Sequence, residues 1–394
     1  MILGGGITGL YAAYLILKHN PDQNVVVLEK DARLGGRIHT YTDKHMTVEA
    51  GAGRFSTNHT LLMDLLREFK LLKKVRPTSS EIKYAEGSPY SLRWVVGKIV
   101  AASLVDVFHD LDAMTFLEYA KKIVSEEETD FLQNAFGYYT ELVVMNAKDA
   151  IALLHHLDEP FNVLDGGLSQ VVDELARRIR MYPNASIRAE EVVSIKRARG
   201  AYQIQTRSKS STHVYVAPWC ICALPKQVLE TFPISLPIQA KLRKIVCGPL
   251  CRIYCTFREP WFGRTKYTTA TPLRIVIPIN ARTIMISYTD NVFADYWNDV
   301  HQREGIAGVN RALKHFIREA FNKEMPPPVE TKVFYWPCGV GYWGVRSEGV
   351  AEQLIEPFSR FYLCGEQYSK GYQQWMEGGL ETAKVVCERL REAF

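Results

Sequence analysis

Three glycines near the start of the chain have the spacing of a turn that holds phosphate groups. They are Gly4, Gly6 and Gly9, and Glu29 follows 20 residues after the last of them. The first glycine permits a tight turn, the second lets the backbone approach a pyrophosphate, and the third allows a helix to pack closely on a strand. An acid at this distance accepts hydrogen bonds from a ribose. These residue types therefore predict a dinucleotide site.

The elements that must position these residues follow in the required order. The apolar stub Met1–Leu3 predicts a strand, and the apolar spacing from Leu10 to His19 predicts a helix. The run Val25–Leu28 is continuously apolar, as in a strand buried on both faces, and Glu29 closes it. Strand, glycine turn, helix, strand and acid form a complete βαβ unit, which weighs against a purely structural glycine turn.

Two further glycine turns carry arginines. Arg33-Leu34-Gly35-Gly36-Arg37 follows the acid, and Glu49-Ala50-Gly51-Ala52-Gly53-Arg54-Phe55 comes next. Such turns supply backbone donors and fixed cations to one extended anionic ligand. A site for NAD needs neither turn, so together they favour FAD. The alternative is two ordinary loops with solvated arginines.

In four ordered blocks the sequence resembles the flavin-containing amine oxidase family, which includes monoamine oxidase, polyamine oxidase and L-amino-acid oxidase. The first two blocks are the glycine turn with its acid and arginines, and the Gly51–Phe55 segment. The third is Gly166–Gln170, followed by a predicted helix and strand. The fourth is Tyr362–Glu366 together with Trp375–Leu380. The order of the blocks is more specific than any single motif.

The resemblance implies which residues hold FAD. The matching positions are Gly4, Gly6, Thr8, Gly9, Glu29, Gly36, Arg37, Gly53, Arg54, Val192, Trp336, Gly365, Glu366, Trp375 and Met376. A helix that starts at Trp375-Met376 would aim its positive end at the flavin O2, where reduced flavin carries negative charge. Relatives with covalent flavin have a cysteine just ahead of this block, where Ser369 and Lys370 stand here. We therefore expect non-covalent FAD.

The same resemblance implies a catalytic neighbourhood around a lysine in a substrate-domain strand. Spacing from both ends of Gly248–Trp261 places Arg252 at that position. Its permanent cation helps a substrate amine lose a proton but repels an incoming ammonium, so an anionic or zwitterionic substrate is easier to accommodate. Alternatively, Arg252 faces solvent or pairs with a carboxylate.

Aromatic residues are expected to wall the space over the flavin. The resemblance places Trp375, Tyr342 and Trp343 there, as rings that suit a neutral amine or a flat apolar group. The alternative for these side chains is packing at the junction of the two domains.

The fold implied is α/β, with a Rossmann-like two-dinucleotide-binding FAD domain and an interleaved α+β substrate-binding domain. We expect the FAD domain at 1–75, 162–240 and 335–394, and the substrate domain at 76–161 and 241–334. Helices are expected around 113–137, an antiparallel sheet from 250 to 286, and a hairpin at 192–206 that turns at Arg199-Gly200.

The function implied is that of an FAD-dependent oxidoreductase. An amine or amino acid would pass a hydride to flavin N5, and oxygen would reoxidise the flavin. One alternative is a related flavoenzyme with a non-amine substrate, such as a desaturase or a protoporphyrinogen-oxidase-like protein. Another is a structural protein that binds FAD but lost catalysis because arginine replaces the lysine.

Composition narrows the partners. The net charge of +5 is spread without a long basic run, so we expect no nucleic-acid partner. The resemblance implies a small-molecule substrate, and the oligomeric state stays open. No stretch reaches the roughly 18 apolar residues that span a bilayer, which predicts a soluble protein that does not bind membranes.

Cysteine and histidine patterns predict no further chemistry. The eight cysteines contain no CxxC pair, and Cys247, Cys251 and Cys255 lack metal-ligand partners. We interpret the cysteines as packing residues of an intracellular, reducing compartment, without disulfides and without a metal site. The pair His155-His156 lacks catalytic context, which favours a structural role.

Overall fold

A five-stranded parallel sheet carries the predicted dinucleotide unit. The computed structural model describes residues 1–394 except 80, 155–158, 210 and 393–394. The strand order is β19-β13-β1-β2-β9, and every neighbouring pair is parallel. The strands are β1 (Ile2–Leu3), β2 (Val25–Glu29), β9 (Ala185–Ala189), β13 (Cys220–Cys222) and β19 (Phe361–Leu363).

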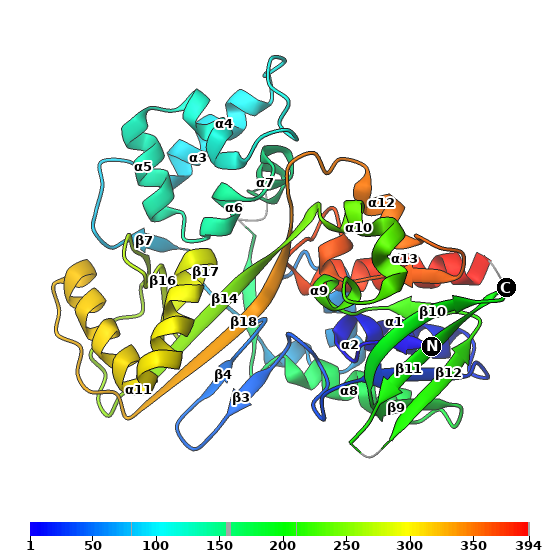
Figure 1. Ribbon diagram of the computed structural model, residues 1–394. Helices are drawn as coiled ribbons and strands as arrows, with labels where there is room; N and C mark the ends of the chain where they lie inside the picture. The colour runs from blue at the N-terminus through cyan, green and yellow to red at the C-terminus, as the bar shows by residue number, and fades with distance from the viewer. Residues whose placement is uncertain (80, 155–158, 210, 393–394) are drawn as a thin grey trace.

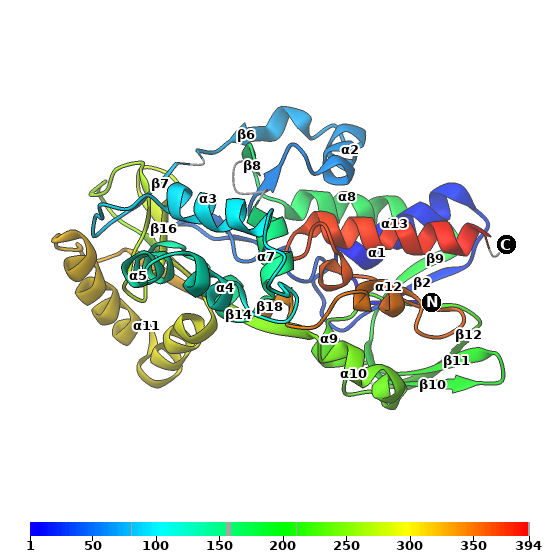
Figure 2. The ribbon, with the colours of Figure 1, turned by 90° about the horizontal axis from the view of Figure 1, so that it is seen from above.

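Three helices cover one side of this sheet, and a small antiparallel sheet lies on the other (Figure 2). The helices are α1 (Ile7–His19), α8 (Ser169–Ile179) and α13 (Met376–Glu392), and α1 packs against both others. The small sheet consists of β10 (Glu191–Ala198), β11 (Ala201–Arg207) and β12 (Thr212–Ala217). The predicted hairpin is confirmed, since Arg199 and Gly200 both take positive φ at the turn between β10 and β11.

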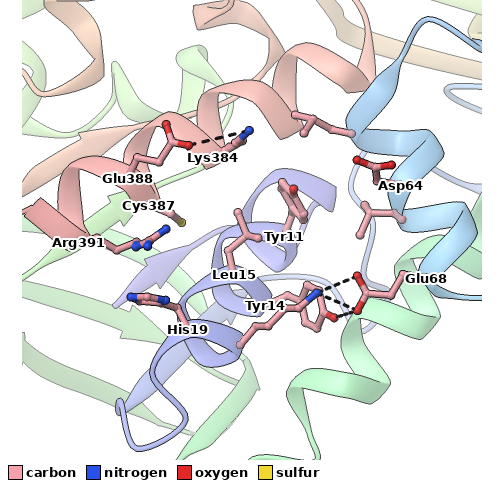
Figure 3. A pocket seen from close by; sticks show the side chains of 13 residues that line it. Tyr11, Tyr14, Leu15, His19, Asp64, Glu68, Lys384, Cys387, Glu388 and Arg391 are labelled. Atoms are coloured by element: carbon pink, nitrogen blue, oxygen red, sulfur yellow. Dashed lines mark hydrogen bonds and ion pairs between the residues drawn. The ribbon is translucent and has the colours of Figure 1, made fainter.

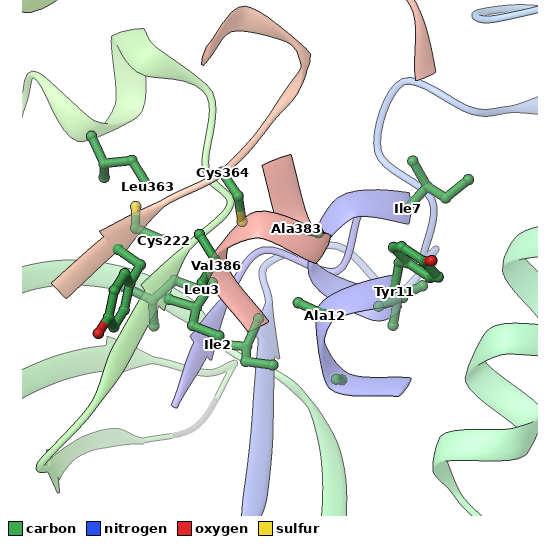
Figure 4. Packing of buried hydrophobic residues seen from close by; sticks show 14 of the residues in the cluster. Ile2, Leu3, Ile7, Tyr11, Ala12, Cys222, Leu363, Cys364, Ala383 and Val386 are labelled. Carbon is green, nitrogen blue, oxygen red and sulfur yellow. The ribbon is translucent and has the colours of Figure 1, made fainter. Parts of the chain in front are cut away.

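The core of this unit forms where α1 and α13 meet the sheet. Ile2 and Leu3 from β1 and Cys222 from β13 pack against Ala12 and Val386 from the two helices (Figure 4). All of these side chains are buried. The apolar residues of the N-terminal strand and helix are thus buried as their pattern predicts.

The second unit is built on a six-stranded sheet in the order β18-β14-β17-β16-β15-β7. Its long strands β14 and β18 run diagonally between the two units (Figure 1). The elements of the unit are β7 (Ile82–Tyr84), β14 (Ile245–Thr256), β15 (Lys266–Thr268), β16 (Ile275–Pro278), β17 (Thr283–Asp290), β18 (Glu330–Trp343), α3 (Leu92–Ser103), α4 (Phe116–Ile123), α5 (Glu126–Ala135), α6 (Tyr139–Val143), α7 (Ala147–Leu154) and α11 (Asn291–Phe321). Helix α11 packs on β14, β17 and β18, whereas α3 to α7 form a helical group with a core of its own.

Short elements connect the two units. They are β3 (Thr40–Thr42), β4 (Thr47–Glu49), β5 (Phe55–Ser56), β6 (Val75–Pro77), β8 (Phe161–Leu164), α2 (Thr60–Glu68), α9 (Lys226–Leu229), α10 (Gln239–Leu242), α12 (Val350–Ile355) and 3-10 turns at Leu72–Lys74, Pro233–Ile238 and Glu366–Tyr368. The segment Pro326–Pro328 links α11 to β18 without regular structure.

The predicted α/β fold class is confirmed by this arrangement. Every strand of the parallel sheet falls inside 1–75, 162–240 or 335–394. Strand β18 (Glu330–Trp343) crosses the boundary expected at residue 335 and so belongs to both segments.

The prediction that all cysteines only pack is wrong for two of them. Cys247 on β14 and Cys338 on β18 form a disulfide, with a Cα–Cα separation of 5.1 Å. The two strands are antiparallel neighbours, which brings together residues 91 positions apart in the sequence. Six buried cysteines remain free. Because one disulfide is present, the cysteines no longer support the prediction of a reducing compartment.

Among the described residues, no helix is long and apolar enough to cross a membrane.

Candidate active site

The glycine turn before α1 forms an open cradle. Gly4 has φ +103°, and a Cβ on Gly9 would lie 2.1 Å from the Gly4 carbonyl oxygen, so both positions require glycine. In contrast, a Cβ on Gly6 would meet no atom closer than 3.9 Å. The space in front of Gly6 is therefore open at the N-terminus of α1, where amide N–H groups bind anions.

The carboxylate of Glu29 is fixed beside this cradle. Its Oε2 accepts a hydrogen bond from the Gly5 amide at 2.7 Å, and its Oε1 accepts one from the Asp31 amide at 3.1 Å. The Glu190 amide donates to the Glu29 carbonyl oxygen at 2.8 Å, which brings the start of β10, with Val192, to the end of β2. The acid and the strand predicted to hold ribose and adenine are thus neighbours.

Arg37 connects three distant segments at the same place. Its Nη1 donates to Oε1 of Glu366 at 2.5 Å and to the carbonyl oxygen of Gly339 at 3.0 Å. Glu366 also accepts a hydrogen bond from the Gln374 amide at 2.9 Å. The arginine follows Gly36, which has φ +56° and lies beside the Gly6 backbone. The structure therefore brings the first and fourth sequence blocks together.

The N-terminus of α13 lies against that of α1. A Cβ on Gly379 would lie 2.4 Å from Oγ1 of Thr8, so the two helices meet in their first turns. Met376 begins α13, and Gly365, with φ +152°, precedes the turn that leads to it. Two helix N-termini at one place create a positive potential. Together with the open cradle, this donor set fits an extended dianionic ligand such as FAD.

Arg252, on β14, packs against the segment that follows β4. Its Nη1 donates to the Glu49 carbonyl oxygen at 3.1 Å and lies 3.0 Å from the position of a Cβ on Gly53. Its guanidinium carbon is 4.5 Å from the centroid of the Tyr288 ring. The side chain is buried and has no carboxylate partner within 4 Å among the described residues, so the alternative of a solvated or ion-paired arginine is wrong. Burial alone would lower the pKa of Arg252, but Tyr254 and Tyr288 hold it above its usual value.

Trp336, on β18, packs against the same segment. Its Nε1 donates to the Ala50 carbonyl oxygen at 2.7 Å, and its ring is 3.4 Å from the position of a Cβ on Gly51. The Gly51–Gly53 segment is thus contacted by Trp336 at Gly51 and by Arg252 at Gly53. The missing side chains of these two glycines leave room for the close approach.

Arg54 lies among aromatic rings. Its guanidinium carbon is 4.7 Å from the centroid of Phe161, 5.6 Å from that of Trp375 and 5.8 Å from that of Tyr138. It also donates a hydrogen bond to the Tyr138 hydroxyl. Phe161 and Trp375 are stacked at 5.3 Å. In the described part of the chain, no carboxylate forms an ion pair with Arg54 within 4 Å, so this half-buried cation is available to an anion.

Tyr342 and Trp343 occupy a different environment from Trp375. Both side chains are 1% exposed. Nε1 of Trp343 donates to the Ser369 carbonyl oxygen at 3.1 Å, and Tyr342 covers Gly248. Trp375, by contrast, is half-buried beside Arg54. The structure groups only Trp375 with this cation. The pair His155-His156 lies outside the described residues.

Sequence reasoning did not identify several residues around Arg54. These are Tyr138, Glu141, Phe161, Lys266 and Tyr288. Burial and the charge of Arg54 lower the pKa of Lys266 to about 8. The five residues come from four separate elements, and no motif connects them. The one available signal was the acid in the apolar, aromatic run Tyr138–Val144.

A surface hollow of about 420 Å³ lies elsewhere, between α1, α2 and α13 (Figure 3). Its cation Lys18 pairs with Glu68 at 3.1 Å, and Lys384 lies 4.0 Å from Glu388. These charges already neutralise each other at the surface. The predicted site residues do not line the hollow, so we assign no chemistry to it.

Comparisons with known proteins agree with the glycine and arginine blocks. A family model described as flavin containing amine oxidoreductase matches residues 7–160 and 100–391. The L-amino acid oxidase bordonein-L of Crotalus durissus terrificus is 20% identical over 100% of this chain and 87% of its own length. The flavin-containing amine oxidase A of Equus caballus is 35% identical over 24% of this chain and 18% of its own. A solved putrescine oxidase variant has a TM-score of 0.82 at 16% identity, over 100% of this chain and 98% of its own, which supports the fold.

Proposed function

This chain belongs to the flavin containing amine oxidoreductase family, and we propose that it binds FAD non-covalently and oxidises an amine or amino acid with oxygen as the electron acceptor. When bound, the flavin supplies the hydride-accepting chemistry. The chain's own residues bind and orient the substrate and keep water from it. The matched family supports an oxidoreductase that uses a flavin, and the arrangement of side chains supports our proposal of an amino-acid substrate.

Residues that would hold FAD come from all four sequence blocks. The first turn of α1 would bind the diphosphate, and Glu29 and the strand with Val192 would contact the ribose and the adenine. Arg37 supplies the nearby cation, and the N-terminus of α13 the second positive helix end. Ser369, at the position of the linking cysteine in some relatives, has its hydroxyl hydrogen-bonded to Glu381. This supports a non-covalent cofactor.

The resemblance implies that Arg54 holds FAD, whereas its place among aromatic rings supports a role in binding the substrate. With that role, Arg54 is the observation that favours an amino acid over a simple amine. A guanidinium that rests on aromatic faces and lacks an ion-pair partner among the described residues binds a carboxylate in two parallel hydrogen bonds. Lys266 is a second cation within electrostatic reach of Arg54, because burial and then the charge of Arg54 lower the pKa of Lys266. An ammonium group alone would be repelled by both cations, whereas the carboxylate of an amino acid would neutralise them.

Arg252 would act as a fixed positive group beside the Gly51–Gly53 segment. Its hydrogen bond to the Glu49 carbonyl and its stack on Tyr288 hold it in one position. A permanent cation there favours the neutral form of a nearby substrate amine, which is the form that releases hydride.

A screen of purified protein tests this function. The protein should show a flavin absorption spectrum, lose the flavin on denaturation, and release peroxide with L-amino acids but less with amines that lack the carboxylate. Glu29→Ala should lower flavin occupancy, while Glu191→Ala, which removes an exposed carboxylate on β10, should not. A colourless wild-type protein in the presence of excess FAD would contradict the proposal.

A further inference from the structure

We propose that Glu141 accepts the proton that the substrate ammonium must lose before hydride leaves the neighbouring carbon. This inference rests on the proposed function and adds a catalytic residue to it. No sequence block pointed to Glu141, because it lies on the short helix α6 between two aromatic and apolar segments.

The geometry of α6 directs Glu141 toward Arg54. Tyr138 is the N-cap of this helix, and Glu141 follows it by three residues, so both side chains lie on the same face. The Tyr138 hydroxyl accepts a hydrogen bond from Arg54. Glu141 is therefore placed on the side of α6 that faces the predicted carboxylate-binding arginine.

A buried acid holds α6 in this position. The carboxylate of Asp290, the last residue of β17, accepts hydrogen bonds from the amides of Tyr139 at 2.9 Å and Thr140 at 2.8 Å. These bonds satisfy amides at the start of the helix, which have no intrahelical acceptor. Asp290 thus anchors the N-terminus of α6, the helix that carries Glu141, to the sheet of the substrate unit.

Glu141 itself has no partner. Among the described residues, no hydrogen bond or ion pair joins its carboxyl group to another group. The side chain nevertheless keeps part of its surface accessible, while burial raises the pKa of Glu141 to about 8. An ionisable group with a strongly raised pKa, partial exposure and no ion-pair partner is a candidate for a functional role.

The charges around Glu141 suit the binding of a zwitterion. Asp290 at the end of β17 raises the pKa of Glu141 further, and Arg54 opposes this effect. Burial raises the pKa of the hydroxyls of Tyr342 on β18 and of Tyr138, and the charge of Glu141 adds to both shifts. Arg54 and Glu141 are thus a cation and an acid that lie on neighbouring elements without an ion pair between them. The carboxylate and ammonium of one amino acid complement such a pair.

The proton transfer balances without any electron transfer. The ammonium N–H bond breaks, the ionised carboxylate of Glu141 gains an O–H bond, and the substrate is left as a neutral amine. A carboxyl group with a pKa near 8 is matched to an amino-acid ammonium far better than an exposed glutamate with a pKa near 4.3. The proton then leaves to solvent when the product departs.

Glu141→Gln tests the assignment, with Glu126→Gln on α5 as the matched control, since Glu126 is an exposed carboxylate of the same helical group. With the best L-amino acid from the peroxide screen, kcat/KM of the wild type should rise with pH to a plateau above about 8. In Glu141→Gln it should fall by about 100-fold or more. In this variant, the increase of kcat/KM near pH 8 should be replaced by an increase at the more alkaline pKa of the substrate ammonium. Glu126→Gln should match the wild type.

A second readout needs no turnover. The infrared band of a protonated carboxyl group should be present in the resting wild-type protein at pH 7, disappear as the pH passes about 8, and be missing in Glu141→Gln. If the wild type oxidises amino acids while Glu141→Gln keeps the same pH profile and infrared band, the role of Glu141 is wrong and the proposed function stands. If no amine or amino acid reduces the wild-type flavin, the proposed function fails and this inference falls with it.

Discussion

Arg37 and Glu366 form an ion pair of 2.5 Å although 329 residues separate them in the sequence. The pair joins the loop after β2 to the turn before α13, and Arg37 also holds the Gly339 carbonyl of β18. Three segments that each carry a predicted cofactor residue are thereby fixed around the glycine turn. The cofactor site is consequently a property of the whole chain and not of its N-terminal βαβ unit alone.

Removal of this cation should weaken flavin binding. We expect Arg37→Ala to raise the Kd for FAD by about 10- to 100-fold, because a hydrogen bond to a charged group contributes roughly 1.5–3 kcal/mol. Titration of apoprotein with FAD, followed by flavin fluorescence, measures the change. Arg76→Ala, which breaks the exposed pair of Arg76 with Asp165, is the control and should bind FAD as the wild type does. Equal affinities of Arg37→Ala and the wild type would remove Arg37 from the site.

Arg252 should matter for the reaction more than for cofactor binding. Arg252→Met removes the charge beside the Gly51–Gly53 segment, and we expect flavin reduction by substrate to slow by about 10- to 100-fold while FAD stays bound. Arg252→Lys keeps the charge but loses the planar stack on Tyr288, so it should recover only part of the rate. Stopped-flow reduction under anaerobic conditions distinguishes the three proteins. If the flavin of Arg252→Met is reduced as fast as that of the wild type, the arginine has a structural role and no role in the reaction.

The carboxyl group of Glu141 should make stability depend on pH. Burial raises its pKa from the model-compound value of 4.5 to about 8, so the folded state binds this proton more tightly than the unfolded state. Its contribution to the free energy of unfolding is fully present below about pH 4.5 and is lost as the pH rises through 8, with a slope of up to about 1.4 kcal/mol per pH unit.

Glu141→Gln removes that dependence. Urea unfolding at pH 5 and pH 9 should show a smaller decrease in the free energy of unfolding for the variant than for the wild type, by a few kcal/mol. The exposed control Glu126→Gln should behave as the wild type does. An equal decrease in all three proteins would show that Glu141 titrates normally.

The disulfide between Cys247 and Cys338 should stabilise the chain. It closes a loop of 91 residues and joins the two strands that run between the units. The double variant Cys247→Ala, Cys338→Ala should lose about 2–4 kcal/mol of unfolding free energy under oxidising conditions. Addition of a reductant should lower the stability of the wild type to a similar level and leave the double variant unchanged. No effect of the reductant on the wild type would contradict the bridge.

Local patterns predicted the parts of the fold whose signals are local. The spacing of Gly4, Gly6 and Gly9, with the apolar strand before Glu29, predicted the βαβ unit. It could do so because the backbone at each of these positions requires a glycine for a local reason. The turn at Arg199-Gly200 was predicted for the same reason. Such features need no knowledge of the distant chain.

The rest of the site depends on tertiary contacts. Arg54 lies among rings from α6, β8 and the start of α13, and no sequence period relates Tyr138, Phe161 and Trp375. The disulfide escaped prediction because only the pairing of β14 with β18 brings its cysteines together. Glu141 was not predicted because the features that distinguish it, partial burial and the lack of an ion-pair partner, depend on the folded chain and not on its neighbours in sequence.

The most direct measurement is the anaerobic reduction of the bound flavin by an L-amino acid and by the amine that lacks its carboxylate, in the wild type and in Arg54→Met. We predict that the amino acid bleaches the flavin of the wild type at far lower concentration than the amine does, and that Arg54→Met loses this preference by about 100-fold, as expected when one partner of a buried charge pair is removed. A wild-type flavin that the amine reduces as readily as the amino acid, with Arg54→Met unchanged, would contradict the account.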